Sequence, residues 1–213
     1  MPFGLRDRQP DALLLAEAYR RLGRVGMIAG SSGNVSTRSA DGMLISPTGT
    51  TALTITEDTV VAMGLDNPAP RASSEWALHA ALYRTRPELH AVVHTHSDAC
   101  TALACLNEPL PAFHYGVLAF GGADVRCAPY TTFGTPELAE LAASAMKDRT
   151  ACLLANHGMI VAAATLEGAL EAAFDLERLC RQYLLARAAG TPRILTAEEV
   201  AAAAERRKTY QSA

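Results

Sequence analysis

Residues 91–96, Ala91-Val92-Val93-His94-Thr95-His96, are the stretch of the sequence that says most about the fold. A short apolar run that leads into two histidines is typical of a buried strand ending at a polar site. Side chains alternate between the faces of a strand, so His94 and His96 project from the same face, about 7 Å apart. Two imidazoles placed in this way can reach one divalent ion. The pair alone is weak evidence, because two merely tolerated histidines give the same pattern.

Helices and strands alternate along the chain on both sides of this stretch. Amphipathic spacing and cap signals predict helices over residues 10–22, 75–84, 135–147, 165–189 and 196–210. Apolar runs between turn signals predict strands over residues 35–38, 43–46, 91–96 and 151–155. Ser74 and Thr135 are the predicted N-caps of the second and third helices. The alternation favours a layered α/β domain with helices covering a sheet, but it does not set the strand directions.

The composition is that of an ordinary water-soluble domain. The chain has 213 residues, 49% of them hydrophobic, and a net charge of −3. We expect no binding to nucleic acid or membranes, because there is no basic excess and no apolar run of spanning length. The N-terminus lacks the apolar stretch of a secretory signal, and the five cysteines include no pair with metal or redox spacing. Both observations favour free thiols in the cytoplasm.

A third histidine strengthens the case for a metal. Asn156-His157-Gly158 directly follows the apolar run 152–155, which places His157 at the end of a buried strand. Three neutral histidines leave a divalent ion its full charge and an open position, as in catalytic zinc sites. Imidazole ligands suit zinc, copper, iron or nickel better than magnesium.

The other histidines leave alternatives open. His79 lies four residues after Glu75, on the same helical face, so these two side chains could be a ligand pair instead. Such a histidine more often packs in the core, here near Trp76. His90 follows a proline in a turn and is expected at the surface, and the role of His114 is undecided.

Three clusters of small residues indicate an anion pocket. They are Ser32-Gly33-Asn34, Thr48-Gly49 and Ser73-Ser74. Turns of this kind expose backbone N–H groups, and the last cluster precedes a predicted helix, whose N-terminus favours an anion. Each cluster alone is more simply a turn or a cap, but three of them around the histidine strand favour a phosphate site. Glu75, which follows, is either a general base or a first-turn acid that complements the helix dipole.

These motifs together resemble the class II aldolase and adducin family along nearly the whole chain. The resemblance rests on residues 33–36, 47–49, 73–76, 91–96, 113–115, 127–130, 132–135, 156–158 and 208–210. It implies one domain over residues 1–213, folded as a three-layer α/β/α sandwich with a central, largely antiparallel sheet. It also implies a homotetramer whose active sites lie at subunit interfaces.

The resemblance assigns roles to individual residues. One Zn²⁺ per subunit, or another divalent transition metal, would bind His94, His96 and His157, with Glu75 both at the metal and acting as the base. Phosphate would bind Gly33, Asn34, Thr48, Gly49, Ser73 and Ser74. Tyr115 would act in the active site of the neighbouring subunit, and Phe133 and Tyr210 would shape the aldehyde end.

The implied reaction is reversible cleavage of a ketose 1-phosphate into dihydroxyacetone phosphate and an aldehyde. The metal would stabilise an enediolate as a Lewis acid. Glu75 would move the proton at its carbon, and Tyr115 would exchange a proton with the aldehyde oxygen. The alternatives are a sugar-phosphate epimerase, dehydratase or decarboxylase on the same scaffold, or an adducin-like interaction module without catalysis.

Overall fold

A seven-stranded mixed sheet forms the centre of the protein in a computed structural model that describes residues 5–211, with side chains described for residues 10–209. The strand order is β3-β2-β1-β4-β9-β8-β7, and all neighbours are antiparallel except β7 and β8. The strands are β1 (Asn34–Ser39), β2 (Gly42–Ile45), β3 (Val61–Met63), β4 (Ala91–Thr95), β7 (Cys127–Ala128), β8 (Ala151–Leu154) and β9 (Gly158–Ala163). The predicted largely antiparallel sheet is confirmed. A separate two-stranded sheet pairs β5 (Leu110–Pro111) with β6 (Asp124–Val125).

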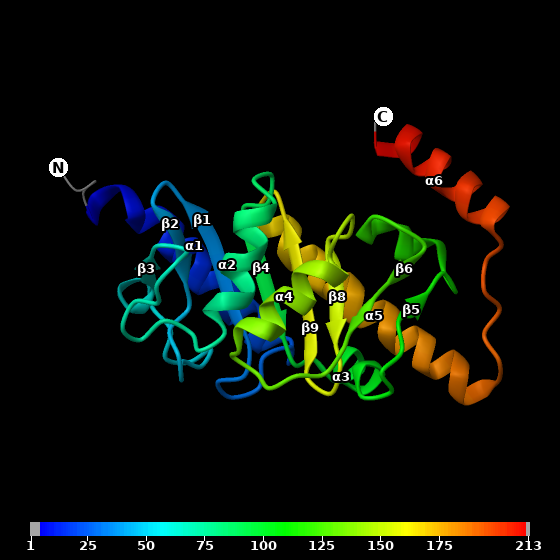
Figure 1. Ribbon diagram of the computed structural model, residues 1–213, viewed down its shortest axis with the longest axis horizontal. Coiled ribbons are helices and arrows are strands. Elements are labelled where there is room, and N and C mark those ends of the chain that lie inside the picture. Colours follow the sequence, from blue (N-terminus) through cyan, green and yellow to red (C-terminus); the bar gives the residue numbers. More distant parts are fainter. Residues whose placement is uncertain (1–4, 212–213) are drawn as a thin grey trace.

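Helices cover both faces of the sheet, as Figure 1 shows. On one face pack α1 (Leu5–Arg24), α3 (Asp98–Ala104) and α5 (Leu166–Ala189), and on the other α2 (Trp76–Thr85) and α4 (Pro136–Ala145). The central strand β4 shows how the sequence builds both layers. Ala91 and Val93 join the first core while Val92 joins the second, because alternate residues of a strand face opposite sides.

The remaining segments lie around this body. A last helix, α6 (Ala197–Gln211), extends away from the sheet and meets the short helix η2 (Tyr115–Phe120). Another short helix, η1 (Glu57–Thr59), follows β2. Within the described residues, no helix combines the length and the apolar character needed to cross a membrane. All five cysteines are free thiols, of which Cys105 is exposed.

The predicted helix starts are confirmed except for α1, which begins at Leu5 rather than at residue 10, and for α2. Thr135 Oγ1 accepts from Leu138 N at 3.3 Å at the start of α4. The predicted Ser74 N-cap is wrong, since α2 begins one residue later with Glu75 as its N-cap. The chain enters α2 through a turn in which Ser73 Oγ accepts from Glu75 N at 3.3 Å. The Glu75 side chain makes no cap hydrogen bond and is therefore available to the site described below.

The sequence did not predict the helix α3, the strands β3, β5, β6, β7 and β9, or the short helices η1 and η2. Strand β9 lies between β4 and β8 and is buried almost throughout, so its apolar run shows no alternation. Helix α3 has only seven residues, too few for a periodic signal. Its start depends on a distant group, because Glu177 accepts from Ala99 N at 2.8 Å and from Cys100 N at 2.9 Å.

Candidate active site

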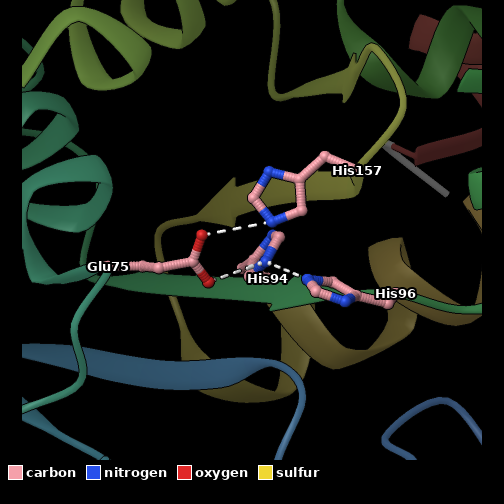
Figure 2. Close-up of side chains that lie close together, drawn as sticks. All are labelled: Glu75, His94, His96 and His157. Carbon is pink, nitrogen blue, oxygen red and sulfur yellow. Dashed lines mark hydrogen bonds and ion pairs between the residues drawn. The ribbon is translucent and has the colours of Figure 1, made fainter. Parts of the chain in front are cut away.

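Four side chains from three parts of the chain meet at one end of the sheet. His94 and His96 come from the end of β4, His157 from the turn between β8 and β9, and Glu75 from the start of α2 (Figure 2). One ligand atom from each residue lies within 4.8 Å of the ligand atoms of the other three. The predicted cluster is thus assembled because β9 pairs with β4 and places its preceding turn beside His96.

The three imidazole rings are arranged around a common point. Their centroids are 4.7–4.9 Å apart, and their planes cross at 71–77°. The His94 and His96 Nε2 atoms lie only 3.0 Å apart. Converging ring nitrogens of this kind are the donor set of a divalent transition metal.

The protein backbone fixes the protonation of His94. Its Nδ1 lies 2.9 Å from the carbonyl oxygen of Met159, to which only a protonated nitrogen can donate. Nδ1 therefore carries a proton, and Nε2 is the ring nitrogen that faces the cluster. A backbone carbonyl behind a histidine commonly orients a metal ligand in this way.

Glu75 provides the negative charge of the site. Its Oε2 lies 3.1 Å from His94 Nε2, and its Oε1 lies 3.1 Å from His157 Nε2. Burial alone would raise the pKa of this carboxyl group, but the neighbouring His94 and His157 imidazoles outweigh burial and hold the pKa well below its usual range. Oε1 is buried without a hydrogen-bond partner. A buried carboxylate oxygen with no donor calls for a cation or a proton.

His96 is suited to bind a metal rather than a proton. Burial, with the charges of His94 and His157, lowers the pKa of His96 to about 4. A neutral imidazole is the form that binds metal. Three imidazole rings and one carboxylate fit a divalent transition ion, so the cluster is a compatible metal site.

The cluster opens into a cavity of about 320 Å³. All seven residues predicted for phosphate and substrate line it, together with Glu75, His96 and His157: Gly33, Asn34, Thr48, Gly49, Ser73, Ser74 and Phe133. Among the described residues, no lysine or arginine lines it. An anion in this cavity would therefore bind hydroxyl and N–H donors beside the cationic centre.

Backbone contacts bring the three small-residue loops together. Gly33 has φ of +103°, and a Cβ there would lie 2.8 Å from His94 O, so glycine allows the first loop to pack on β4. Thr48 N donates to Arg71 O at 2.8 Å, which joins the second loop to the segment before Ser73. The loops are therefore neighbours although they are distant in sequence.

Sequence reasoning gave no role to five lining residues: Ser31, Pro47, Tyr130, Thr131 and Asn156. Pro47, Tyr130 and Asn156 lie within recognised motifs, and Ser31 and Thr131 lie next to them, so these positions were the available signal.

Two predicted residues lie elsewhere. Tyr115 is 66% exposed and lines a different cavity, between η2 and α6. Tyr210 lies in α6, but its side chain is outside the described part of the structure.

The other histidines also have defined places. His79 is fully buried and does not join the ligand cluster, so the alternative ligand pair of Glu75 and His79 is not formed. His90 is exposed, as expected. His114 Nδ1 accepts from Gly116 N at 3.0 Å, and its ring stacks on Tyr115.

Comparison with known proteins identifies the class that this fold and site define. The Class II Aldolase and Adducin N-terminal domain family matches residues 14–184, and the chain belongs to this family. Its relatives include aldolases at 43% identity, which makes it a lyase of the class II aldolase type.

Three particular proteins are closely similar. The L-fuculose phosphate aldolase of Escherichia coli O6:H1 is 43% identical over 208 residues, covering 96% of this chain and 97% of that protein. The 5-methylthioribulose-1-phosphate/5-deoxyribulose-1-phosphate aldolase of Rhodospirillum rubrum is 43% identical over 199 residues, covering 92% and 90%. A solved L-fuculose 1-phosphate aldolase superposes with a TM-score of 0.87 at 37% identity, covering 96% and 98%.

Proposed function

We propose that the protein reversibly cleaves a ketose 1-phosphate, of the L-fuculose 1-phosphate type, into dihydroxyacetone phosphate and an aldehyde. The observation that carries this proposal is a cavity that joins a His/Glu cluster to loops with neutral anion donors. Two functional groups of one substrate, a phosphate and a neighbouring ketone, require this pairing of sites. The names of the relatives support a phosphorylated ketose as the substrate.

His94, His96, His157 and Glu75 would hold the cation, for which we propose Zn²⁺, one per subunit. When bound, it supplies positive charge next to the oxygens that become negative as the carbon–carbon bond breaks. The cluster lies at the inner end of the cavity, with His94 and Glu75 buried. Water is thus limited where charge develops, which strengthens the electrostatic effect.

The loops of the cavity would hold the phosphate. Gly33, Asn34, Thr48, Gly49, Ser73 and Ser74 present backbone N–H groups, hydroxyls or an amide along one wall. Binding the phosphate there directs the ketone end of the substrate toward Glu75. Holding both ends of a small substrate reduces the entropy that must be lost at the reacting carbon.

Glu75 would move the proton at the carbon next to the ketone. Its carboxylate is ionised and buried beside the cavity, and Oε1 has no hydrogen-bond partner. A base needs a free oxygen within reach of the substrate. Phe133, which is exposed at the cavity, would contact the aldehyde portion, and Tyr210 would act at the same end.

Tyr115 would exchange a proton with the aldehyde oxygen in the site of a neighbouring subunit. Its hydroxyl-bearing side chain is exposed on a different part of the surface from the cavity of its own chain. A cytoplasmic homotetramer with active sites between subunits would bring the two together.

A substrate panel tests the proposal. Protein loaded with Zn²⁺ is incubated with L-fuculose 1-phosphate, 5-deoxyribulose 1-phosphate and 5-methylthioribulose 1-phosphate, and released dihydroxyacetone phosphate is measured by enzymatic reduction. We expect cleavage of at least one. His157→Ala is the matched control and should lose both bound metal, measured by elemental analysis, and cleavage.

The other outcomes distinguish the alternatives. Conversion to an isomeric sugar phosphate without fragments would identify an epimerase. Loss of water or of carbon dioxide from a related substrate would identify a dehydratase or a decarboxylase. Wild-type protein that binds no metal would favour an interaction module.

A further inference from the structure

Behind Glu75, a chain of hydrogen-bonded side chains runs away from the cavity between β1 and α2. Asn34 Nδ2 donates to Glu75 Oε2 at 3.1 Å, and Asn34 Oδ1 lies 2.5 Å from His79 Nε2. On the far side, His79 Nδ1 lies 2.6 Å from Ser36 Oγ, which lies 2.8 Å from the Tyr83 hydroxyl oxygen. All five side chains are buried.

This series of hydrogen bonds forms because two residues along a strand and four residues along a helix span similar distances. Asn34 and Ser36 are two residues apart on one face of β1, a separation of about 6.7 Å. Glu75, His79 and Tyr83 follow one another at intervals of four residues along α2, about 6 Å each. The polar groups of the two elements therefore interdigitate, and each one finds a partner.

Glu75, the first group of this series, determines which partner donates in each of its hydrogen bonds. An ionised Glu75 only accepts, so the Asn34 amide turns its Nδ2 toward Glu75 and its Oδ1 toward His79. Asn34 Oδ1 also only accepts, so His79 carries its proton on Nε2. The bare Nδ1 of the neutral ring then accepts from Ser36 Oγ, and Ser36 Oγ accepts from the Tyr83 hydroxyl.

This arrangement makes the two oxygens of Glu75 different. Oε2 is held by Asn34, whereas Oε1 has no hydrogen-bond partner, although His157 Nε2 lies 3.1 Å away. A rotated Asn34 amide would place its oxygen against the carboxylate and repel it. The orientation of Asn34, fixed from behind by His79, therefore determines which carboxylate oxygen remains free.

We propose that His79 is a positioning residue for Glu75. It acts through the Asn34 amide, and Ser36 and Tyr83 hold its ring as the Nε2–H tautomer. This role goes beyond the proposed function and rests on it only for the kinetic measurement described below. Groups that orient a metal-site side chain from behind typically contribute 10–100-fold to metal affinity or activity.

Nuclear magnetic resonance tests the donor and acceptor roles in these hydrogen bonds without any substrate. The zinc-loaded protein is labelled with ¹⁵N-histidine, and the signals of His79 are identified by their absence in His79→Gln. We expect the chemical shifts of a neutral ring protonated at Nε2. A ring protonated at Nδ1, or at both nitrogens, near neutral pH would overturn the proposal.

Substitutions test the effect on the site. His79→Leu keeps an apolar side chain in the core but removes both hydrogen bonds. His79→Gln can still donate to Asn34 and accept from Ser36. We expect kcat to fall by about 10–100-fold in His79→Leu, with KM within about threefold, and to recover at least in part in His79→Gln. The visible spectrum of Co²⁺-substituted protein should change in His79→Leu and return toward wild type in His79→Gln.

Leu82→Ala is the matched control, because Leu82 is a buried residue of α2 outside this chain of polar groups. It should lower the melting temperature and leave kcat and the Co²⁺ spectrum unchanged. If His79→Leu behaves in the same way, His79 is a packing residue and the proposal is wrong. If His79→Leu does not fold, Ser36→Ala and His79→Gln, compared with Leu82→Ala, decide by the same measurements.

Failure of the proposed aldolase function can be distinguished from failure of the proposed role of His79. Wild-type protein would then cleave no ketose 1-phosphate, yet the tautomer of His79 and the Co²⁺ spectra would still be measured. A protonated Nε2 with a spectrum sensitive to His79 would support the positioning role, and the opposite results would overturn it.

Discussion

At the scale of single residues, the site depends on the negative charge of Glu75 and on the position of the proton on the His94 ring. Glu75 is ionised in a buried position because imidazoles surround it. His94 is fixed as one tautomer by the carbonyl oxygen of Met159. Neither property follows from the residue type alone, and each can be tested by a single substitution.

Glu75→Gln tests the proposed base. The change keeps the shape of the side chain but removes its negative charge and its ability to take a proton. We expect exchange of a carbon-bound hydrogen of dihydroxyacetone phosphate with solvent deuterium to fall by at least about 100-fold, followed by nuclear magnetic resonance. Circular dichroism and metal content serve as controls for the fold and the centre. Near-normal exchange would show that another group is the base.

His79 makes a second residue-level prediction, on the pH dependence of stability. Burial, together with the charge of His94, lowers the pKa of His79 from its usual 6.5 to about 3, although Glu75 acts in the opposite direction. The folded protein thus favours the neutral His79 ring. The contribution of this ring to the free energy of unfolding is therefore complete above pH 6.5 and is lost as the pH falls toward 3. The free energy of unfolding should fall by about 2 kcal/mol between pH 7 and 5, because each pH unit below 6.5 removes about 1.36 kcal/mol.

Urea unfolding of metal-free protein at pH 7 and 5 measures this effect. His79→Gln has no group that titrates at this position, so its stability should fall by about 2 kcal/mol less than that of wild type over the same range. The difference between the two proteins cancels the contributions of the other histidines. Equal losses in both would mean that folding does not lower the pKa of His79.

At the scale of elements, the turn between β8 and β9 delivers His157 to the end of β4. Gly158 opens β9 directly against β4, and a Cβ at this position would lie 2.4 Å from Thr95 O and 3.1 Å from His96 Cδ2. Backbone cannot move aside there without separating two central strands. The glycine therefore allows His157 and His96 to approach each other.

Gly158→Ala tests this close approach. We expect a loss of about 1–3 kcal/mol of unfolding free energy and weaker metal binding, because the added methyl group overpacks the contact. Thermal unfolding and titration with a competing chelator measure the two effects. Gly190→Ala is the control, since nothing lies within 4 Å of a Cβ at that position. Wild-type stability in Gly158→Ala would contradict the interpretation.

The loops of the cavity make a separate prediction. Ser74 is exposed in the cavity, whereas Ser73 Oγ also accepts from Glu75 N. Ser74→Ala is therefore the cleaner variant, and we expect KM for the phosphorylated substrate to rise about 10-fold, with kcat little changed, as for one lost hydrogen bond. Ser144→Ala, on the exposed surface of α4, is the control. An unchanged KM would place the phosphate elsewhere.

At the scale of the whole molecule, the cavity of one chain lacks the predicted Tyr115. The residue lies in η2, next to α6, with 66% of its surface exposed. An exposed aromatic side chain beside an extended helix suits a subunit interface. The shared active site and the single domain over residues 1–213 remain predictions.

Mixing two inactive variants tests the shared site. Tyr115→Phe and Glu75→Gln proteins are unfolded together and reassembled, and mixed oligomers are confirmed by native mass spectrometry. If each site takes Glu75 from one subunit and Tyr115 from its neighbour, about a quarter of the sites in a random mixture contain both. Recovery of aldol cleavage near that level is expected. Mixed oligomers without activity would assign Tyr115 to its own subunit.

Features that neighbouring residues encode could be predicted from the sequence. The strand 91–96 with its two histidines, the cap at Thr135 and the small-residue loops are local patterns, and the structure contains them all. The candidate ligand cluster could be predicted for the same reason, since a strand of period two places His94 and His96 on one face.

The contacts between these segments became visible only in the folded structure. The sequence did not reveal β9, because a strand buried on both faces shows no alternation. Nor did it assign Asn34 and His79 as partners, since they come from β1 and α2, 45 residues apart. Contacts between distant segments depend on strand pairing and helix packing, which the residues at each position do not encode locally. The orientation of Glu75 therefore became apparent only in the folded protein.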